Sequence, residues 1–244
     1  MPFPTADSPV PYVTTAQMIE VDRLMIDEYA IDLPRMMENA GRALAHLARE
    51  RFLQGDPRGR RITVLAGSGG NGGGALVAAR RLANYGAQVS VFTGRPLMDF
   101  TPVPAHQVRI LQRQGVPITA DSVPDDRPTP DLILDGVIGY SLKGPPVGRA
   151  ADLIRWANTS AAPVLALDVP SGVDTTTGQA FDPAVRAAAT LTLALPKEGL
   201  KAVPEYVGEL YLADISVPPA LYAEPSLNLD VGPLFAASDI IRIV

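Results

Sequence analysis

A glycine cluster between two apolar segments constrains the fold of this chain more than any other feature. The segment GSGGNG, residues 67–72, fits the pattern G-x-G-x-x-G. The apolar residues 62–66 before it predict a buried strand, and residues 73–85 after it predict a helix that Gly86 ends. A strand, a glycine turn and a helix in this order are typical of a turn whose bare backbone and helix N-terminus bind phosphate.

Strand-like and helical segments alternate along the rest of the chain. Predicted strands occupy residues 88–93, 116–119, 132–137, 164–167, 190–195 and 210–215, and predicted helices occupy residues 15–29, 106–114 and 148–158, with another helix starting near residue 32. Such alternation implies parallel β-α-β units, and continuous apolar strands suit a sheet covered on both faces. We therefore predict an α/β fold: a three-layer α/β/α sandwich with a Rossmann-like, mostly parallel sheet.

The segment pattern predicts one domain, residues 14–244, without an internal linker. The proline-rich residues 1–13 predict an N-terminal arm that is either extended or frayed. The segment VPDDRPTP, residues 123–130, predicts a surface loop. We expect the apolar C-terminal residues 240–244 to pair either with an edge of the sheet or with a second subunit.

Composition excludes several classes of protein. The 244 residues include 26 acidic and 21 basic side chains, and the net charge of −5 argues against a nucleic-acid-binding surface. The sequence contains neither the long apolar run of a membrane helix nor the pattern of a secretory signal. It also contains no cysteine, which excludes disulfides and thiolate metal sites. We expect a cytoplasmic protein that binds neither nucleic acid nor membrane.

The glycine turn alone is open to three interpretations: a phosphate-binding turn of another kind of site, the turn of an ordinary dinucleotide-binding oxidoreductase, and a purely structural turn. An ordinary dinucleotide-binding unit has an acidic residue after its second strand to bind the ribose, whereas that strand is followed here by Gly94 and Arg95, with no acid before Asp99. The chain also lacks a plausible His–Asp or Tyr–Lys catalytic pair, which disfavours an ordinary nicotinamide-dependent oxidoreductase. A third interpretation is purely structural, because glycines also let a strand and a helix pack closely.

Two aspartates lie where predicted strands end. Asp135 lies inside the apolar segment LILDGV, and Asp168 ends the segment PVLALD before a Pro-Ser-Gly turn. The carboxyl ends of parallel strands face the crevice in which open α/β sheets bind ligands. One such aspartate more often stabilises a turn or caps a helix. Two of them beside a glycine turn indicate a binding site.

Segments spread over residues 14–215 resemble, in order, the signatures of one protein family. They are TTAQMIEVDRLMIDEYAIDLPRMMENAGRALA, AGSGGNGGGALVAARRL, LDGVIGYSLKG, LDVPSGVDTTTG and AAATLTLALPKEGL. Together they are similar to the YjeF N-terminal domain family, the NAD(P)H-hydrate epimerases. That family acts on NADH or NADPH that has gained water across the nicotinamide ring. It interconverts the R and S epimers so that a dehydratase can repair the S form.

The resemblance also implies the residues of the site. The residues matching the family's substrate contacts are Gly70, Asn71, Gly72, Gly73, Gly74, Gly139, Tyr140, Ser141, Leu142, Lys143, Gly144, Pro145 and Asp168. Family members bind a potassium ion, and the matching ligands are Asn71, Asp135 and Ser171. We expect Asp135 to act at the reacting centre as a catalytic residue as well, and Lys143 to approach the phosphates. The resemblance further implies hydrated NADH or NADPH as substrate, a separate dehydratase as pathway partner and a homodimer.

The glycine turn departs from the family pattern. The family has N-N-G-G-D where this chain has Gly-Asn-Gly-Gly-Gly at residues 70–74, and Ala75 replaces the next glycine. Loss of an acid at a helix N-terminus removes a charge that the helix dipole favours, although the backbone N–H groups remain. The alternative to an epimerase is therefore a non-catalytic relative that binds a nucleotide-like ligand or a protein partner. The retained ion ligands and Asp168 favour the epimerase.

Overall fold

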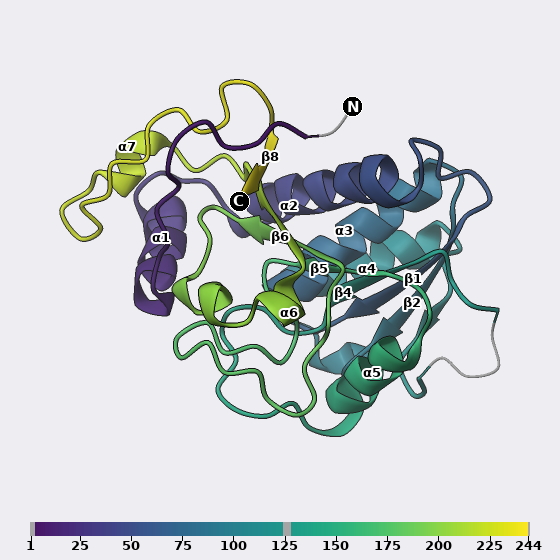
Figure 1. Ribbon diagram of the computed structural model, residues 1–244. Helices are drawn as coiled ribbons and strands as arrows, with labels where there is room; N and C mark the ends of the chain where they lie inside the picture. Colours follow the sequence, from purple (N-terminus) through teal and green to yellow (C-terminus); the bar gives the residue numbers. More distant parts are fainter. Residues whose placement is uncertain (1–2, 124–127, 244) are drawn as a thin grey trace.

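The computed structural model describes residues 3–123 and 128–243. Part of the predicted surface loop, residues 124–127, and the C-terminal residue Val244 lie outside this description. Along the described chain, strands and helices alternate as the sequence predicts (Figure 1).

One sheet organises the described residues. Its eight strands lie in the order β3-β2-β1-β4-β5-β6-β7-β8, and every neighbouring pair is parallel except β7 and β8. The strands are β1 (Arg61–Ala66), β2 (Gln88–Thr93), β3 (Ile118–Thr119), β4 (Leu132–Gly136), β5 (Val164–Leu167), β6 (Ala189–Leu193), β7 (Glu209–Ala213) and β8 (Ile240–Ile243). The order 3-2-1-4-5-6 is that of a Rossmann fold, so the prediction of a Rossmann-like, mostly parallel sheet is confirmed.

The helices flank this sheet. They are α1 (Thr15–Asp27), α2 (Leu33–Leu47), α3 (Gly70–Asn84), α4 (Pro102–Arg113), α5 (Gly148–Thr159), α6 (Pro204–Val207) and α7 (Pro219–Tyr222), with short η1 (Ala48–Phe52), η2 (Leu97–Asp99) and η3 (Glu198–Ala202). Thr14 forms the predicted capping box with Gln17 at the start of α1, and Asp32 caps α2 by accepting the N–H of Arg35.

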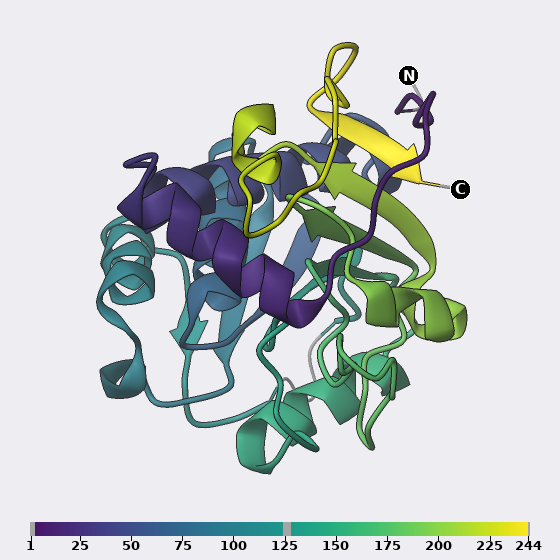
Figure 2. The ribbon, with the colours of Figure 1, turned by 90° about the vertical axis from the view of Figure 1, so that its left-hand side faces the viewer.

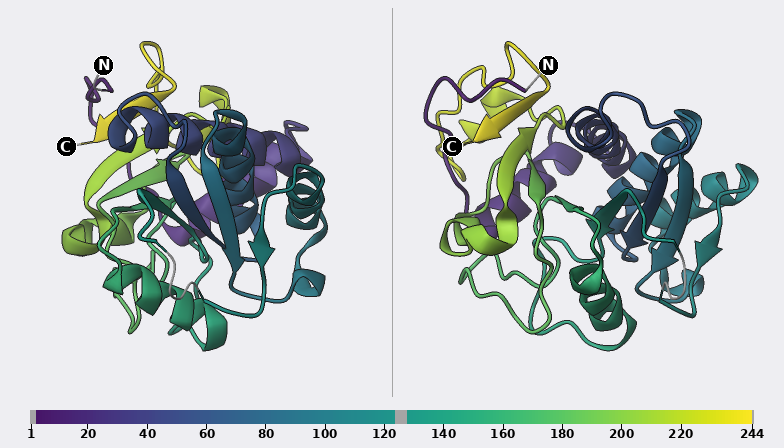
Figure 3. Two further views of the ribbon diagram at one scale, coloured as in Figure 1. Left: turned by 90° about the vertical axis from the view of Figure 1, so that its right-hand side faces the viewer. Right: turned by 45° about the vertical axis from the view of Figure 1, so that its right-hand side comes forward.

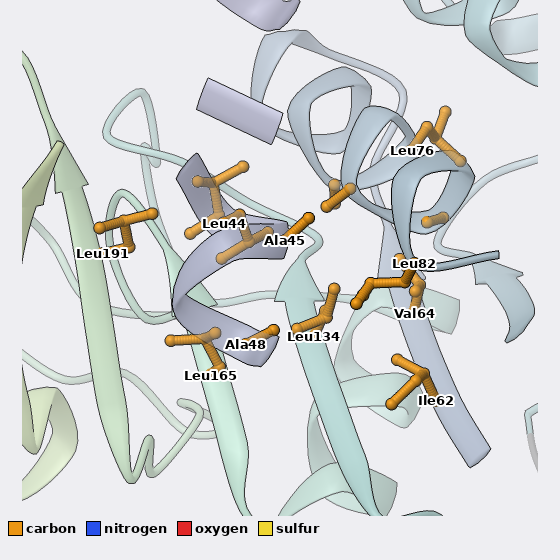
Figure 4. Packing of buried hydrophobic residues seen from close by; sticks show 14 of the residues in the cluster. Leu44, Ala45, Ala48, Ile62, Val64, Leu76, Leu82, Leu134, Leu165 and Leu191 are labelled. Atoms are coloured by element: carbon orange, nitrogen blue, oxygen red, sulfur yellow. The ribbon is translucent and has the colours of Figure 1, made fainter. Parts of the chain in front are cut away.

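Successive side chains along the central strands pack into hydrophobic cores on opposite faces of the sheet. Val64 of β1 and Leu134 of β4 pack with α2, α3 and α4, whereas Leu65 and Ile133, one position away, pack with α5 on the other face. Figure 4 shows Leu44 and Ala48 lying over Leu134 and Leu165 on the first face. The right-hand view of Figure 3 shows the dark blue α2 and the green α5 on opposite sides of the strands. The prediction of three layers is confirmed.

The two ends of the described chain are both tied to the far edge of the sheet. β8 pairs antiparallel with β7, which confirms the first of the two predicted pairings for the C-terminal residues. The N-terminal arm is extended: the N–H of Ala6 donates to the Arg242 carbonyl at 2.9 Å, and the N–H of Val13 donates to the Pro196 carbonyl at 2.8 Å. The arm therefore runs from β8 to the start of α1 (Figure 2).

Helix α3 begins at Gly70, three residues before the predicted start at Gly73. Glycine disfavours helix, so local propensity placed these residues in the turn. Close packing reverses that preference. A Cβ atom at Gly72 would overlap the Gly67 carbonyl, one at Gly73 would overlap the Met37 side chain, and α2 packs directly on this turn of α3. The missing side chains let the first turn of α3 lie against α2 and the end of β1.

Candidate active site

A cavity of about 580 Å³ lies beyond the carboxyl ends of the central strands. The strand order reverses between β1 and β4, and open α/β sheets bind ligands at such a point. One end of the cavity is lined by the glycine turn and by Gly94 and Arg95 after β2. The other end is lined by Asp22 of α1, Asp168 after β5 and Lys197 after β6.

The glycines of the turn differ in what surrounds them. A Cβ atom at Gly67 would overlap the Val137 carbonyl of the neighbouring β4 turn, and the N–H of Gly67 donates to the Gly136 carbonyl at 3.0 Å. By contrast, a Cβ atom at Gly69 or Gly70 would have no atom within 4 Å. Gly67 is thus required by packing between β1 and β4. Gly69 and Gly70 present open backbone to the cavity at the N-terminus of α3, where N–H groups favour an anion.

The residue after β5 forms a buried ion pair. Asp168 has a positive φ of 65° and accepts a hydrogen bond from the N–H of Leu193 at 3.2 Å. Its carboxylate pairs with the ammonium of Lys197, a side chain with no exposed surface that also donates to the Leu193 carbonyl at 2.9 Å. Two charges held this far from water and facing a cavity are typical of a functional site.

A second polar pair lies at the same end of the cavity. The Tyr140 hydroxyl donates to the Asp22 carboxylate at 2.5 Å and so joins the loop after β4 to α1. Burial raises the pKa of Asp22, while the bond from Tyr140 and the charge of Lys197 act in the opposite direction. Burial also raises the pKa of Tyr140, and the Asp22 charge adds to the shift. The Lys197 ammonium lies 5.9 Å from the centre of the Tyr140 ring.

Asp135 lies beneath the cavity and not in its lining. Its carboxylate is fully buried and accepts hydrogen bonds from the Ser171 hydroxyl at 2.6 Å, the Ser171 N–H at 2.8 Å and the Val137 N–H at 3.2 Å. Burial raises the pKa of Asp135 to about 6 against these bonds, which lower it. The expected direct chemical role for Asp135 gains no support from this position, because its carboxylate does not face the cavity.

The predicted ion ligands lie close together around the same turn. The Ser171 hydroxyl contacts both Asp135 and the backbone of Ile138, and a Cβ atom at Gly139 would lie 3.3 Å from the Asn71 amide carbon. The Asn71 amide is buried and neither its oxygen nor its nitrogen has a hydrogen-bond partner. An unpaired buried amide costs free energy, so the Asn71 oxygen is available to bind a ligand. Together with the oxygens of Asp135 and Ser171, it forms a donor set suited to a hard cation. Among the described residues, no cluster of histidines or carboxylates suits a transition metal.

The remaining predicted site residues divide into two groups. Those that line the cavity are Gly70, Asn71, Gly72, Gly74, Gly139, Tyr140, Ser141, Leu142, Pro145 and Asp168. Gly73, Lys143 and Gly144 do not, and Gly73 faces Met37 of α2 instead. Asp22, Arg95 and Lys197 also line the cavity, although none of them is among the residues predicted from the sequence. Asp22 and Lys197 lie inside the segments that match the family, and their place in those segments was the available signal.

Several known proteins are similar to this chain over most of its length. Residues 34–199 match the family described as YjeF-related protein N-terminus. The NAD(P)H-hydrate epimerase of Dehalogenimonas lykanthroporepellens is 44% identical over 232 residues, covering 95% of this chain and 92% of that protein. The bifunctional NAD(P)H-hydrate repair enzyme Nnr of Moorella thermoacetica is 36% identical over 225 residues, and this chain spans 42% of its length.

A solved structure supports the fold independently. The crystal structure of the yeast protein YNL200c superposes with a TM-score of 0.80, covering 96% of this chain and all of that one at 23% identity. Within the described residues, no helix is both long and apolar enough to cross a membrane. The family match over residues 34–199 and the 44% identity over nearly the whole chain show that this protein belongs to the YjeF-related N-terminal family.

Proposed function

We propose that this chain is an NAD(P)H-hydrate epimerase, an isomerase that interconverts the R and S epimers of hydrated NADH or NADPH. The observation that carries the proposal is the buried Asp168–Lys197 pair at one end of a cavity that begins at a glycine turn. The epimerases of Dehalogenimonas lykanthroporepellens and Truepera radiovictrix, 44% and 35% identical to this chain, support it.

The chemistry requires a proton donor and stabilisation of positive charge. The hydrated carbon bears a hydroxyl group next to the ring nitrogen, so losing and regaining that hydroxyl through an iminium-like species, or opening the ring, scrambles the stereocentre. In the iminium route, protonation of the oxygen that leaves as water assists the step, and a carboxylate stabilises the cationic ring. In the ring-opening route the carbon–nitrogen bond breaks instead, its electron pair stays on the ring nitrogen, and the hydroxyl group loses its proton to a base and becomes the aldehyde oxygen. The cavity end that holds Asp22, Tyr140, Asp168 and Lys197 supplies both kinds of group.

We assign the roles by contact and charge. The Asp168 carboxylate, held by the Lys197 ammonium and the Leu193 N–H, faces the developing positive charge of the ring. Asp22, whose raised pKa favours a retained proton, is the donor to the leaving oxygen, with Tyr140 positioning its carboxyl group. The open backbone at Gly69 and Gly70 binds phosphate, and the loop residues of 139–145 that line the cavity, Gly139 to Leu142 and Pro145, cover the ligand.

We further propose that Asn71, Asp135 and Ser171, with the Ile138 carbonyl, hold a potassium ion. The unpaired Asn71 amide oxygen and the Ser171 hydroxyl on the Asp135 carboxylate support this site. A cation there would hold the β1, β4 and β5 turns together and so keep the floor of the cavity in place.

Potassium is expected to stabilise the protein measurably. At ten times its Kd, an ion that binds only the folded state adds about 1.4 kcal/mol, or roughly 3–6 °C in Tm for a domain of this size. Scanning fluorimetry in potassium chloride, against tetramethylammonium chloride at equal ionic strength, measures the shift. Asn71→Leu should abolish it. A shift of equal size in that variant would contradict the assigned ligands.

The proposal extends to partners and location. We place the reaction ahead of that of a dehydratase, which the naming of relatives in Moorella thermoacetica and Salinibacter ruber as bifunctional repair enzymes supports. A cytoplasmic location and a dehydratase on a separate protein stay predictions. A homodimer stays a prediction, which light scattering tests. β8 pairs with β7 of its own sheet, and Thr5 of the N-terminal arm pairs with Arg242 of β8.

Epimer exchange tests the proposed function directly. Purified protein supplied with R-form hydrated NADH or NADPH and potassium should produce the S form faster than the spontaneous rate, as followed by chromatography. Spontaneous rates with both substrates would overturn the epimerase.

The non-catalytic alternative rests on the altered glycine turn. A Cβ atom at Gly74, where the family has an acid, would lie 2.8 Å from the end of the Leu167 side chain, so this chain has neither that carboxylate nor open space for it. Ligand binding without turnover in the exchange assay would favour this alternative.

A further inference from the structure

Arg95 is the cation at the opposite end of the cavity from the proposed chemistry. It follows β2 by two residues, lines the cavity beside Gly94 and is exposed. The Thr93 hydroxyl donates to the Arg95 carbonyl at 2.7 Å, which constrains the backbone from which the side chain projects. Across the described residues, the Arg95 guanidinium has neither an ion pair nor a side-chain hydrogen bond.

The end of β2 has a defined role in doubly wound dinucleotide-binding folds. The strand next to the first one ends beside the adenosine ribose, where a carboxylate binds the 2′-hydroxyl of NAD-type ligands and an arginine accommodates the 2′-phosphate of NADP-type ligands. In this cavity the lining carboxylates are Asp22 and Asp168, both at the far end. The β2 end therefore holds an arginine and no acid.

The two ends of the cavity are separated by a distance that suits the two halves of a dinucleotide. β2 and β6 are four strand spacings apart in the sheet, or about 19 Å. Lys197, after β6, is already neutralised by Asp168. Arg95 is consequently the unpaired cation in the described cavity lining, and it lies on the side where the adenosine half is expected when the reactive ring lies near Asp168.

We propose that Arg95 binds the 2′-phosphate of hydrated NADPH and gives this chain a preference for the NADPH form over the NADH form. The inference rests on the proposed function for the identity of the ligand. A charge-assisted hydrogen bond from a guanidinium to a phosphate corresponds to a preference of roughly 10- to 100-fold. If Arg95 bound the pyrophosphate instead, both forms would gain equally, because they share that group.

Kinetic discrimination is the first test. The kcat/KM for hydrated NADPH divided by that for hydrated NADH should be well above one in the parent protein and fall by roughly 10- to 100-fold in Arg95→Gln. Arg95→Lys, which keeps the charge, should retain part of the ratio. Arg155→Gln, an exposed arginine of α5 outside the cavity lining, should leave the ratio unchanged. Equal efficiency with both forms, or a ratio unaffected in Arg95→Gln, overturns the assignment.

A binding test separates this inference from the epimerase itself. Calorimetry compares adenosine 2′,5′-bisphosphate with adenosine 5′-monophosphate, which differ in the 2′-phosphate alone. The bisphosphate should bind the parent protein at least about tenfold more tightly, and Arg95→Gln should remove the difference. Equal affinities, or binding of neither compound, overturn the inference even where epimer exchange proceeds. A tighter bisphosphate with no epimer exchange would leave Arg95 assigned and remove the proposed reaction.

Discussion

Asp168→Asn is expected to lower the epimerase kcat by roughly 10²- to 10⁴-fold, because the amide carries no charge to place against the cationic ring. Asparagine tolerates the positive φ of 65° at this position, so the backbone is expected to stay as it is. Quenched-flow or steady-state epimer exchange gives kcat, and KM should change less. A kcat within a few-fold of the parent value would remove Asp168 from the chemistry.

The same pair predicts a large effect on stability. Lys197→Met leaves the Asp168 carboxylate buried without its cation, which is expected to cost about 3–5 kcal/mol in the free energy of unfolding. The double variant Asp168→Asn/Lys197→Met removes both charges at similar volume and should recover most of that loss. Urea unfolding measures all three proteins.

Activity and stability should respond differently in the double variant. The double variant is expected to fold yet stay inactive, whereas a merely structural pair would return its activity together with its stability. Recovery of epimer exchange in the double variant would therefore contradict the functional role of the pair.

Gly72→Ala is the second variant for which we expect a large loss. The added Cβ overlaps the Gly67 carbonyl, a backbone atom that no side-chain rotation can move away, so β1 and α3 must separate. We expect a loss of about 3 kcal/mol or more in the free energy of unfolding. Thermal unfolding followed by circular dichroism measures it.

Gly70→Ala is the matched control for Gly72→Ala. It adds the same methyl group two residues earlier in α3, where no atom lies within 4 Å, and alanine is the better helix former. Its Tm should equal or exceed that of the parent protein. Equal losses in both variants would show that the glycine turn tolerates no side chain for reasons other than the overlap.

The sequence predicted the strands well because their apolar runs are local signals. β2 and β5 have the predicted bounds, and β1 begins one residue earlier than predicted. β6 ends at Leu193 and not at residue 195, since Ala194 has a φ of 61° that no strand continues through. α4 starts at Pro102, four residues before the predicted helix, because prolines fit the first turn of a helix although they interrupt its pattern.

Site residues that belong to sequence motifs could be predicted, whereas roles that depend on how deeply a side chain is buried could not. Of the ion ligands that the family match implies, Asp135 and Ser171 are in direct contact, and Asn71 lies against Gly139. Lys197 could not be recognised from its residue type, because lysine is almost always exposed and its burial depends on contacts with Asp168 across 29 residues. The exclusion of Asp135 from the cavity is likewise a property of packing depth, which strand position alone does not give.

The pairing of the N-terminal arm with β8 brings segments near the two ends of the described chain next to each other. The N–H of Arg242 donates to the Pro4 carbonyl at 2.8 Å, so the backbone near both ends runs side by side. The two segments are parallel, so a peptide bridge that closed the chain on itself would have to run back along β8 before joining them, and new ends opened at a surface loop would then define a circular permutant.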